Sequence, residues 1–204
     1  FVRVYQIKFS TWQTETYFEA DYPDGRIARF GYSPDSVVNL SGVYVAGTFV
    51  PNGPYIWAVS DVTGALGDAY TVTYERVDAY GELHPKSIAY AGATIDFKYG
   101  PRTDLAAVWF PAYPSAVKRL GVLNKIIVSL NALPVREYRL DSNLVNNQLR
   151  LEKVQECGYT ESGTLDACLR PLTFGWSTVS GGTNNYTIAV SSVMATTSTP
   201  CAAP

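Results

Sequence analysis

The sequence predicts an all-β protein: an antiparallel meander of many short strands, arranged as a curved open sheet or a sandwich and joined by long Gly/Pro loops. Short segments in which apolar and polar residues alternate recur along the chain, as expected of half-buried strands. Turn residues separate these segments by about 8 to 12 residues, a spacing that favours antiparallel pairing over βαβ winding. Fifteen Tyr, eight Phe, 16 Gly and 12 Pro fit the same interpretation, because aromatic residues favour strands while Gly and Pro favour turns.

The composition excludes several classes of protein. The 204 residues carry 16 basic and 18 acidic side chains, so we expect no nucleic-acid partner, which would need a strongly basic surface. Hydrophobic residues make up 47% and charged residues 17%, which is too apolar for a disordered chain. The apolar runs are too interrupted to predict a membrane span. The chain starts at Phe1 without Met, and we expect it to be a processed or excised segment.

Two regions differ in composition. Residues 1–176 contain all the charged side chains, and we expect them to form one β module. Residues 177–204 carry no charge and are rich in Ser, Thr, Gly, Asn and Ala. Within them residues 185–193 are a candidate strand, and the remainder is expected to be a linker or tail.

The N-terminal third predicts two strands and a long loop. Residues 5–10 alternate apolar and polar side chains, so we expect a strand there. Pro23-Asp24-Gly25 predicts a turn, because Pro presets φ and Gly accepts a positive φ, and residues 26–32 are expected to return as a strand. Residues 33–54, which contain several Gly and Pro, are expected to form a loop with one short strand at 42–50.

The middle of the chain predicts strands and a hairpin. Residues 55–59 are an apolar run, residues 61–67 form a turn, and residues 70–77 form a strand. Ala91-Gly92 separates residues 86–90 from residues 94–99, which is a hairpin signal. On the second arm Ile95, Phe97 and Tyr99 are expected to face inward, and Thr94, Asp96 and Lys98 outward.

The remaining segments complete the strand count. Residues 105–120 combine helix-favouring Ala with interrupting Pro, and we expect irregular structure there. Residues 124–130 and 135–140 are expected to form a second hairpin around residues 131–134. Residues 149–157 and 172–176 are expected to be the last strands of the module.

One segment near the end of the module resembles a known family. Glu156-Cys157-Gly158 is followed by Ala167-Cys168-Leu169-Arg170-Pro171-Leu172-Thr173-Phe174-Gly175-Trp176. The pair of segments resembles the close of a β-rich module in bacterial Rhs/YD-repeat proteins and in relatives of the SpvB and TcB (TcdB-like) toxin components. Upstream matches follow in the family's order: Asp24-Gly25 with Phe30-Gly31, Trp57 with Asp61, residues 70–74, residues 85–90, residues 96–99 with Arg102 and Asp104, and residues 135–140 with Tyr138. The resemblance covers about residues 15–176.

The three Cys predict a disulfide between Cys157 and Cys168. The two residues flank a Gly-containing loop, and closing so small a ring contributes roughly 2 to 3 kcal/mol in the chain-entropy model. Free buried thiols and half of a metal site are the alternatives. A zinc site needs four ligands, and one His with three scattered Cys does not supply them at a familiar spacing. Cys201 is then the odd thiol, unpaired or intermolecular.

No other pattern predicts catalysis, a cofactor or a metal. His84 is the only imidazole, it precedes Pro85, and we interpret it as a turn residue at a strand start. Asp24, Asp61 and Asp141 are expected at turns, where Asp bonds to its own backbone. The phosphate-binding Gly motifs are absent. Arg102 and Asp104 are two residues apart, and we expect an ion pair across the hairpin.

Two functions remain. The resemblance implies a non-catalytic structural module of a large secreted or cell-surface bacterial protein, which builds part of a β-sheet shell or an interaction surface. Its partners would be other segments of the same protein or copies of itself, joined through edge strands. The alternative is an extracellular carbohydrate-binding module that uses exposed Tyr and Trp. Three or more coplanar exposed aromatic rings favour the alternative, and a buried aromatic set favours the structural module.

Overall fold

The computed structural model describes residues 1–8, 16–45, 48–77, 81–108, 117–146 and 148–176 of the chain. In chain order its elements are β1 (Arg3–Lys8), β2 (Thr16–Asp21), β3 (Ile27–Phe30), the 3-10 helix η1 (Pro34–Ser36), β4 (Val37–Val45), β5 (Thr48–Trp57), β6 (Val59–Thr63), β7 (Ala69–Val77), β8 (Glu82–Tyr90), β9 (Ala93–Val108), β10 (Val117–Leu130), β11 (Leu133–Val145), β12 (Gln148–Tyr159), β13 (Leu165–Cys168) and β14 (Leu172–Thr173). The predicted all-β class is therefore confirmed. Among these elements there is no helix long and apolar enough to cross a membrane.

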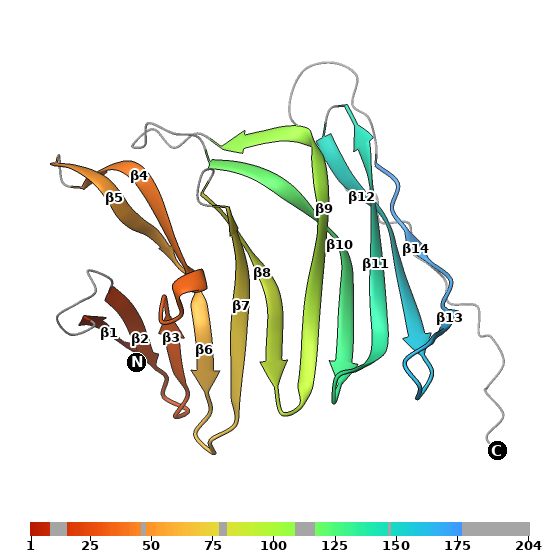
Figure 1. Ribbon diagram of the computed structural model, residues 1–204, viewed down its shortest axis with the longest axis horizontal. Coiled ribbons are helices and arrows are strands. Elements are labelled where there is room, and N and C mark those ends of the chain that lie inside the picture. Colours follow the sequence, from red (N-terminus) through yellow and green to blue (C-terminus); the bar gives the residue numbers. More distant parts are fainter. Residues whose placement is uncertain (9–15, 46–47, 78–80, 109–116, 147, 177–204) are drawn as a thin grey trace.

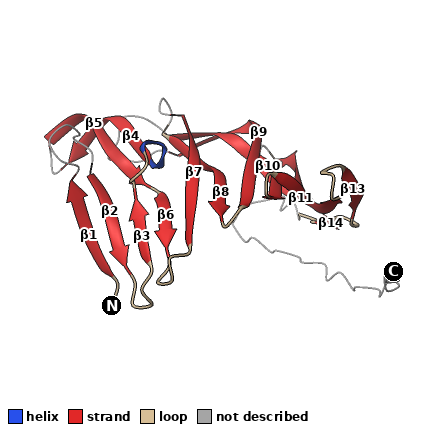
Figure 2. Ribbon diagram, turned by 60° about the horizontal axis from the view of Figure 1, so that its bottom comes forward, coloured by secondary structure: helices blue, strands red, loops and turns tan. Residues whose placement is uncertain are grey.

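The strands form one open antiparallel meander. Twelve of them make a single sheet in the order β1-β2-β3-β6-β7-β8-β9-β10-β11-β12-β13, with β14 paired to β12 as well. Figures 1 and 2 show this sheet as one broad, curved layer, with β1 at one end and β13 and β14 at the other. The sheet is not closed on itself, so the curved open sheet is the correct choice between the two predicted arrangements. β4 and β5 leave this layer and pair with each other as a separate two-stranded arm.

The register gives the large sheet two chemically different faces, because directly opposed residues of antiparallel strands point to the same side. One line of opposed residues is apolar from β1 to β11: Val4, Ala20, Ala28, Val62, Tyr70, Tyr90, Ala93, Leu130 and Leu133. The adjacent line points to the other side and is mainly polar: Tyr5, Glu19, Arg29, Asp61, Thr71, Ala89, Thr94, Ser129 and Pro134. We call these sides the apolar face and the polar face.

The buried core is small and lies toward the β2–β7 end of the sheet. Ala20, Ala28, Val62 and Val72 are less than 9% exposed on the apolar face. Near them, the indole of Trp57 lies edge-on to the ring of Phe18, with the ring centroids 5.1 Å apart. From β7 onward the line of opposed residues next to the turns is exposed, and Tyr70, Tyr90, Leu130 and Leu133 are between 38% and 52% exposed.

Two predicted hairpins are present, and their turns have the required backbone. Ala91 and Gly92 have φ of 44° and 78°, and Asn131 and Ala132 have φ of 49° and 67°. Two successive residues with positive φ form the two-residue turn whose twist matches that of the flanking strands. β9 and β10 extend well beyond the predicted arms, so the prediction of irregular structure at residues 105–120 is wrong at both ends of that segment. Its residues 109–116 lie outside the described ranges.

The segment at residues 33–54 was predicted wrongly as a loop with one strand. It contains η1, β4 and most of β5. The two prolines of β5, Pro51 and Pro54, are compatible with a strand because β5 pairs with β4 alone among the strands that the structure describes. Proline lacks the N–H that a strand paired on both sides would need. The predicted strand at residues 42–50 in fact spans the end of β4 and the start of β5.

Several single expectations are also corrected. β2 and β13 were not predicted, and β1 begins two residues earlier than expected. Asp61 lies within β6 and Asp141 within β11, so neither is a turn residue, and His84 lies within β8. Of the predicted strand at residues 172–176, only Leu172–Thr173 pairs. Residues 177–204, including the candidate strand at 185–193 and Cys201, lie outside the described part of the chain.

Candidate functional site

A groove of about 370 Å³ lies beside η1, β6 and β7, and most of its accessible lining is apolar. The charged and larger polar residues that border it are Arg29, Tyr32, Asp35, Asp61, Thr71 and Thr73. Opposed register positions place Arg29, Asp61 and Thr71 in one line across three strands. Neighbouring strands therefore bring together a cation, a carboxylate and a hydroxyl group on one surface.

The cation of the groove is held on two sides. Arg29 Nε donates to Asp61 Oδ1 at 2.8 Å, and its guanidinium carbon lies 4.2 Å from the centroid of the Tyr32 ring. Burial by itself would lower the pKa of Arg29, but the hydrogen bond and the charge of Asp61 outweigh burial and raise that pKa. The guanidinium is thus fixed in place and stays charged.

Ser60 fixes the segment after β3, whose residues Tyr32 and Ser33 line the groove. Its hydroxyl oxygen accepts the N–H of Tyr32 at 2.9 Å and that of Ser33 at 3.1 Å, and it lies 2.8 Å from Ser36 Oγ. Ser36 and Ser60 are 0% and 4% exposed. Satisfying two backbone donors with one buried hydroxyl ties the chain after β3 to β6.

A second tie joins η1 to β7. Asp35 Oδ2 accepts the N–H of Tyr74 at 2.7 Å, and the Tyr74 hydroxyl donates to the carbonyl of Val59 at 2.8 Å. Burial raises the pKa of Tyr74 to about 12, and the Asp35 charge acts in the same direction. The N–H of Tyr74 thus holds the carboxylate of Asp35, which is one of the residues that line the groove.

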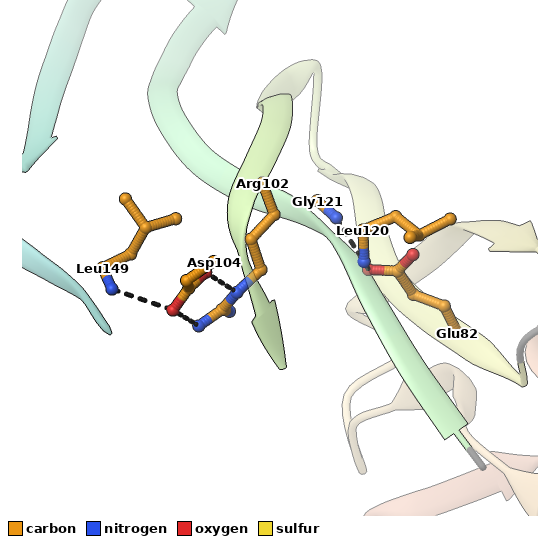
Figure 3. Close-up of polar contacts among 6 residues, drawn as sticks. All are labelled: Glu82, Arg102, Asp104, Leu120, Gly121 and Leu149. Carbon is orange, nitrogen blue, oxygen red and sulfur yellow. Dashed lines mark hydrogen bonds and ion pairs between the residues drawn. The ribbon is translucent and has the colours of Figure 1, made fainter. Parts of the chain in front are cut away.

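A large bulge lies where β9 pairs with the start of β10. Between the pairs Arg119↔Ala106 and Gly121↔Pro101 β10 advances by two positions and β9 by five. The extra residues of β9 interrupt the ladder, and backbone groups on both sides lose their regular partners. Two carboxylates lie at this bulge, as Figure 3 shows.

Glu82 binds the β10 side of the bulge. Its Oε1 accepts the N–H groups of Leu120 and Gly121, each at 2.9 Å, although β9 lies between β8 and β10 in the sheet. The side chain is 6% exposed. A buried carboxylate that accepts two backbone donors replaces the interrupted ladder at this point.

Asp104 binds the opposite side of the bulge. Arg102 Nη2 donates to Asp104 Oδ2 at 2.9 Å, and the N–H of Leu149 donates to the same oxygen at 2.8 Å. The hydrogen bond from Arg102 lowers the pKa of Asp104, although burial opposes the shift. The expected ion pair exists, but it lies within β9 and not across the hairpin. The hydrogen bond from Leu149 to Asp104 joins β9 to the first residues of β12.

His84 lies beside Glu82 without a close hydrogen bond. Its Nδ1 is 3.7 Å from Glu82 Oε1 and its Nε2 is 3.5 Å from Glu75 Oε2, while its ring centroid is 3.9 Å from that of Tyr99. Nε2 is buried and has no hydrogen-bond partner in the described part of the chain. The described residues contain no group of three or more His, Cys, Asp or Glu side chains that could hold a metal ion.

A buried carboxylate also lies near the C-terminal edge. Glu137 is 1% exposed, accepts from the Tyr159 hydroxyl at 2.6 Å, and forms ion pairs with Arg139 and with Lys125, whose Nζ is 3.3 Å away. Burial by itself would raise the pKa of Glu137, but these three donors outweigh burial and lower it. Glu82 and Glu137 were not predicted from the sequence as bonded acids, because most of their partners, Leu120, Gly121, Lys125 and Tyr159, belong to other strands.

Cys157 and Cys168 form a disulfide, as expected, and they occupy directly opposed positions of β12 and β13. Beyond them the N–H of Phe174 donates to the carbonyl of Glu152 at 2.8 Å, and Trp176 Nε1 donates to the carbonyl of Leu151 at 2.7 Å. The indole therefore ties the end of the described chain to β12. Both motif aromatics are at the edge, and they are 36% and 42% exposed.

The remaining motif residues have structural contacts. Asp24 accepts the N–H of Arg26 at the predicted turn, where Gly25 has a φ of 84°. Trp57 Nε1 donates to the carbonyl of Thr16 at 2.9 Å, which ties the arm to β2. Tyr138 is half-buried in β11, opposite Ile126 of β10. The matched positions thus lie at turns, strand junctions and one edge.

Exposed aromatic rings do not form a long row in the described part of the sheet. Tyr70 and Tyr90 are opposed and exposed, but their neighbours across the strands are Val62 and Ala93. Trp57, Tyr74 and Trp176 use their N–H or O–H groups to bind backbone carbonyls. The arrangement that would favour an aromatic sugar platform is therefore limited to two rings among the described residues.

Comparison with known proteins gives a likeness of fold. No protein-family model matches the chain, and no curated protein matches it. The chain is similar to part of the crystal structure of TcdB2-TccC3, with a TM-score of 0.67 and 12% sequence identity over 86% of this chain and 11% of that chain. It is also similar to the N-terminal domain of the effector protein SpvB from Salmonella typhimurium strain LT2, with a TM-score of 0.47 and 12% identity over 86% of this chain and 66% of that chain. The chain thus spans about a tenth of the length of the first structure, and the expected resemblance to TcB-type proteins is confirmed in its fold.

Proposed function

We propose that the chain is a non-catalytic structural module of a large secreted or cell-surface bacterial protein of the Rhs/toxin type. In this role it forms part of a β-sheet shell or an interaction surface. The observation that carries the proposal is the single-layer sheet with one apolar face, on which Tyr70, Tyr90, Leu130 and Leu133 remain 38% to 52% exposed. A sheet buries its apolar face against another layer when it is part of a larger assembly.

The exposed apolar face favours covering by other polypeptide. Burial of apolar surface contributes about 25 cal/mol per Å², and soluble monomers rarely leave large contiguous apolar patches in water. Other segments of the same large protein, or copies of this chain, are the proposed partners. The similarity to a tenth of the TcdB2-TccC3 chain supports a piece of a longer structure.

The two ends of the sheet differ as sites for strand addition. β1 is an uninterrupted six-residue strand that, among the described strands, pairs with β2 alone. The opposite end consists of two short strands separated by Pro171, and the Trp176 indole binds the carbonyl of Leu151 there. Short strands and Pro blunt an edge, so we expect self-association through β1 and not through β13 or β14.

The disulfide supports an extracellular location. Cys157 and Cys168 form the bond at the sheet edge, and disulfides persist mainly in oxidising compartments. The bond is thus consistent with the proposed location on the cell surface or outside the cell.

A matched pair of substitutions tests the structural role. Leu130→Lys introduces a charge on the exposed apolar face, and Thr94→Lys introduces it on the polar face, beside Ser129 of β10. Sedimentation velocity over a concentration series and binding of a hydrophobic dye are measured on the full chain. We expect self-association and dye binding that Leu130→Lys weakens and Thr94→Lys leaves unchanged. A chain that binds no dye and stays monomeric at all concentrations contradicts the proposal.

Carbohydrate binding is the second candidate function. The observation that favours it is the exposed and directly opposed pair of aromatic rings of Tyr70 and Tyr90.

A further inference from the structure

We propose that His84 is a pH-sensitive link of the sheet, which joins Glu75 of β7 to Glu82 of β8 when its imidazole is protonated. Through Glu82 this link also tightens the bulge between β9 and β10. The inference goes beyond the structural role, because it concerns how the sheet itself responds to acid. It holds or fails whatever covers the apolar face.

Each ring nitrogen of His84 faces a carboxylate oxygen. Nε2 lies 3.5 Å from Glu75 Oε2, and Nδ1 lies 3.7 Å from Glu82 Oε1. A carboxylate ion only accepts hydrogen bonds, whereas a neutral imidazole has one N–H and one acceptor nitrogen. A neutral ring can therefore donate to one of the two acids only. The imidazolium ion carries an N–H on both nitrogens and matches both acids.

Two buried atoms of this cluster have no hydrogen-bond partner among the described residues. They are His84 Nε2 and Glu82 Oε2, and their side chains are 15% and 6% exposed. A buried polar group without a partner destabilises the folded state. Protonation lets Nε2 donate to Glu75, and Oε2 offers the N–H of Nδ1 an unused acceptor. Uptake of one proton can thus satisfy both atoms.

The other groups that contact His84 are uncharged. The Tyr99 ring of β9 has its centroid 3.9 Å from that of the imidazole, and a Cβ placed on Gly121 of β10 would lie 3.4 Å from His84 Cε1. Burial raises the pKa of Tyr99, and the charge of Glu75 acts in the same direction, so the phenol stays neutral below pH 8. The charged contacts of His84 in the described structure are therefore the two carboxylates.

Glu82 connects the imidazole to the bulge. Its Oε1 accepts the N–H groups of Leu120 and Gly121, each at 2.9 Å. An imidazolium ion bonded to the same carboxylate holds it in place and joins it to β7. Local opening of the bulge then has to break these contacts as well, so protonation of His84 makes opening less frequent.

The experiment follows the imidazole and the bulge together in the full chain. His84 is the only His of the sequence, so the imidazole C–H signals in an NMR spectrum report this residue alone. The pH is lowered from about 8 to about 5.5, which covers the ordinary range of imidazole and stays above that of Asp and Glu. Amide exchange of Leu120 and Gly121 is measured as protection factors, which remove the direct effect of pH on exchange.

We expect the protection factors of both amides to rise about twofold to fivefold on acidification, the range that a partly exposed ion pair gives. The rise should follow the titration of the imidazole signals. At about pH 8, where the ring is neutral, Glu75→Gln should match the unmodified chain.

Three substitutions locate the link. His84→Gln should abolish the rise in protection, and Glu75→Gln should remove at least about half of it on a logarithmic scale. Glu152→Gln is the matched control, because it removes the same charge from an exposed position on β12, and it should keep the full rise. If His84→Gln does not fold, Glu75→Gln still decides, since Glu75 is 62% exposed.

Three results would overturn the proposal. The first is an imidazole that titrates while the protection of Leu120 and Gly121 stays constant or falls. The second is a full response in Glu75→Gln. The third is an imidazole that does not titrate in the folded chain over this pH range.

Discussion

Glu82 and Gly121 lie 39 positions apart in the sequence, and the carboxylate of Glu82 accepts the N–H of Gly121 at 2.9 Å. The two residues belong to β8 and β10, which are separated in the sheet by β9. The bulge lies next to the pair Gly121↔Pro101 and leaves Leu120 without an opposed residue in β9, and Glu82 accepts the N–H groups of both Leu120 and Gly121. A single buried acid thus maintains the pairing of the sheet at its largest irregularity.

The first prediction concerns this acid. Glu82→Ala leaves the N–H groups of Leu120 and Gly121 without their acceptor, and we expect a loss of about 2 kcal/mol in the free energy of unfolding. Denaturant unfolding measures the loss, and amide exchange of the two residues should increase. Glu75→Ala is the control, because Glu75 is 62% exposed and also lies near His84, and we expect a change below about 0.5 kcal/mol. Equal effects of the two substitutions would contradict the structural role of Glu82.

The second prediction separates a steric clash from backbone strain. Gly31 has a φ of 73°, and a Cβ placed on it would lie 2.4 Å from Trp57 Cδ1. Gly67 has a φ of 84° and no atom within 4 Å of such a Cβ. We expect Gly67→Ala to cost about 1 kcal/mol and Gly31→Ala about 3 kcal/mol or more, since the second adds overpacking to strain. Unfolding followed by tryptophan fluorescence tests both, and similar costs would show that Trp57 moves aside freely.

The third prediction concerns stability in acid. The pKa of Glu137 is lowered in the folded protein, because the donors Tyr159, Arg139 and Lys125 outweigh burial. A carboxyl group with a lowered folded-state pKa stabilises the fold above its ordinary pKa, and this contribution is lost as the pH falls through the folded-state value. We therefore expect the free energy of unfolding to decrease between about pH 5 and pH 2, and to decrease less in Glu137→Gln.

The control for the acid experiment is Asp96→Asn. Asp96 is 36% exposed and lies 3.9 Å from Lys98. We expect this variant to follow the pH dependence of the unmodified chain. An unchanged slope in Glu137→Gln would show that Glu137 is not a source of the acid sensitivity.

The fourth prediction concerns the disulfide. In a Cys201→Ser background, unreduced protein should show no reactive thiol and reduced protein should show two, because Cys157 and Cys168 are bonded. Reduction should lower the free energy of unfolding by about 2 to 3 kcal/mol, the entropy of a small ring. Amide protection should decrease in β13 and remain in β8, which lies on the other side of β9. Two reactive thiols before reduction would contradict the bond.

The local features of the fold were predictable from short stretches of sequence. The turns at Asp24-Gly25 and Ala91-Gly92 and the second hairpin depend on residues within a few positions of one another. The predictions that were wrong also have physical reasons. Pro51 and Pro54 argue against a strand, and only the pairing of β5 on one edge makes them acceptable. β2 and β13 are short strands, of six and four residues, and carry a weak signal of their own.

By itself the sequence determined the antiparallel class, the positions of the tight turns and the Cys157–Cys168 pairing, because backbone preference and side-chain alternation act over a few residues. Only the tertiary structure decided that the sheet is a single open layer and which groups of other strands bind Glu82, Asp104 and Glu137. Those groups lie between 12 and 45 positions away, with the backbone contacts at 38 to 45. Such contacts depend on the register and bulges of several strands at once, and no short segment of the chain encodes them.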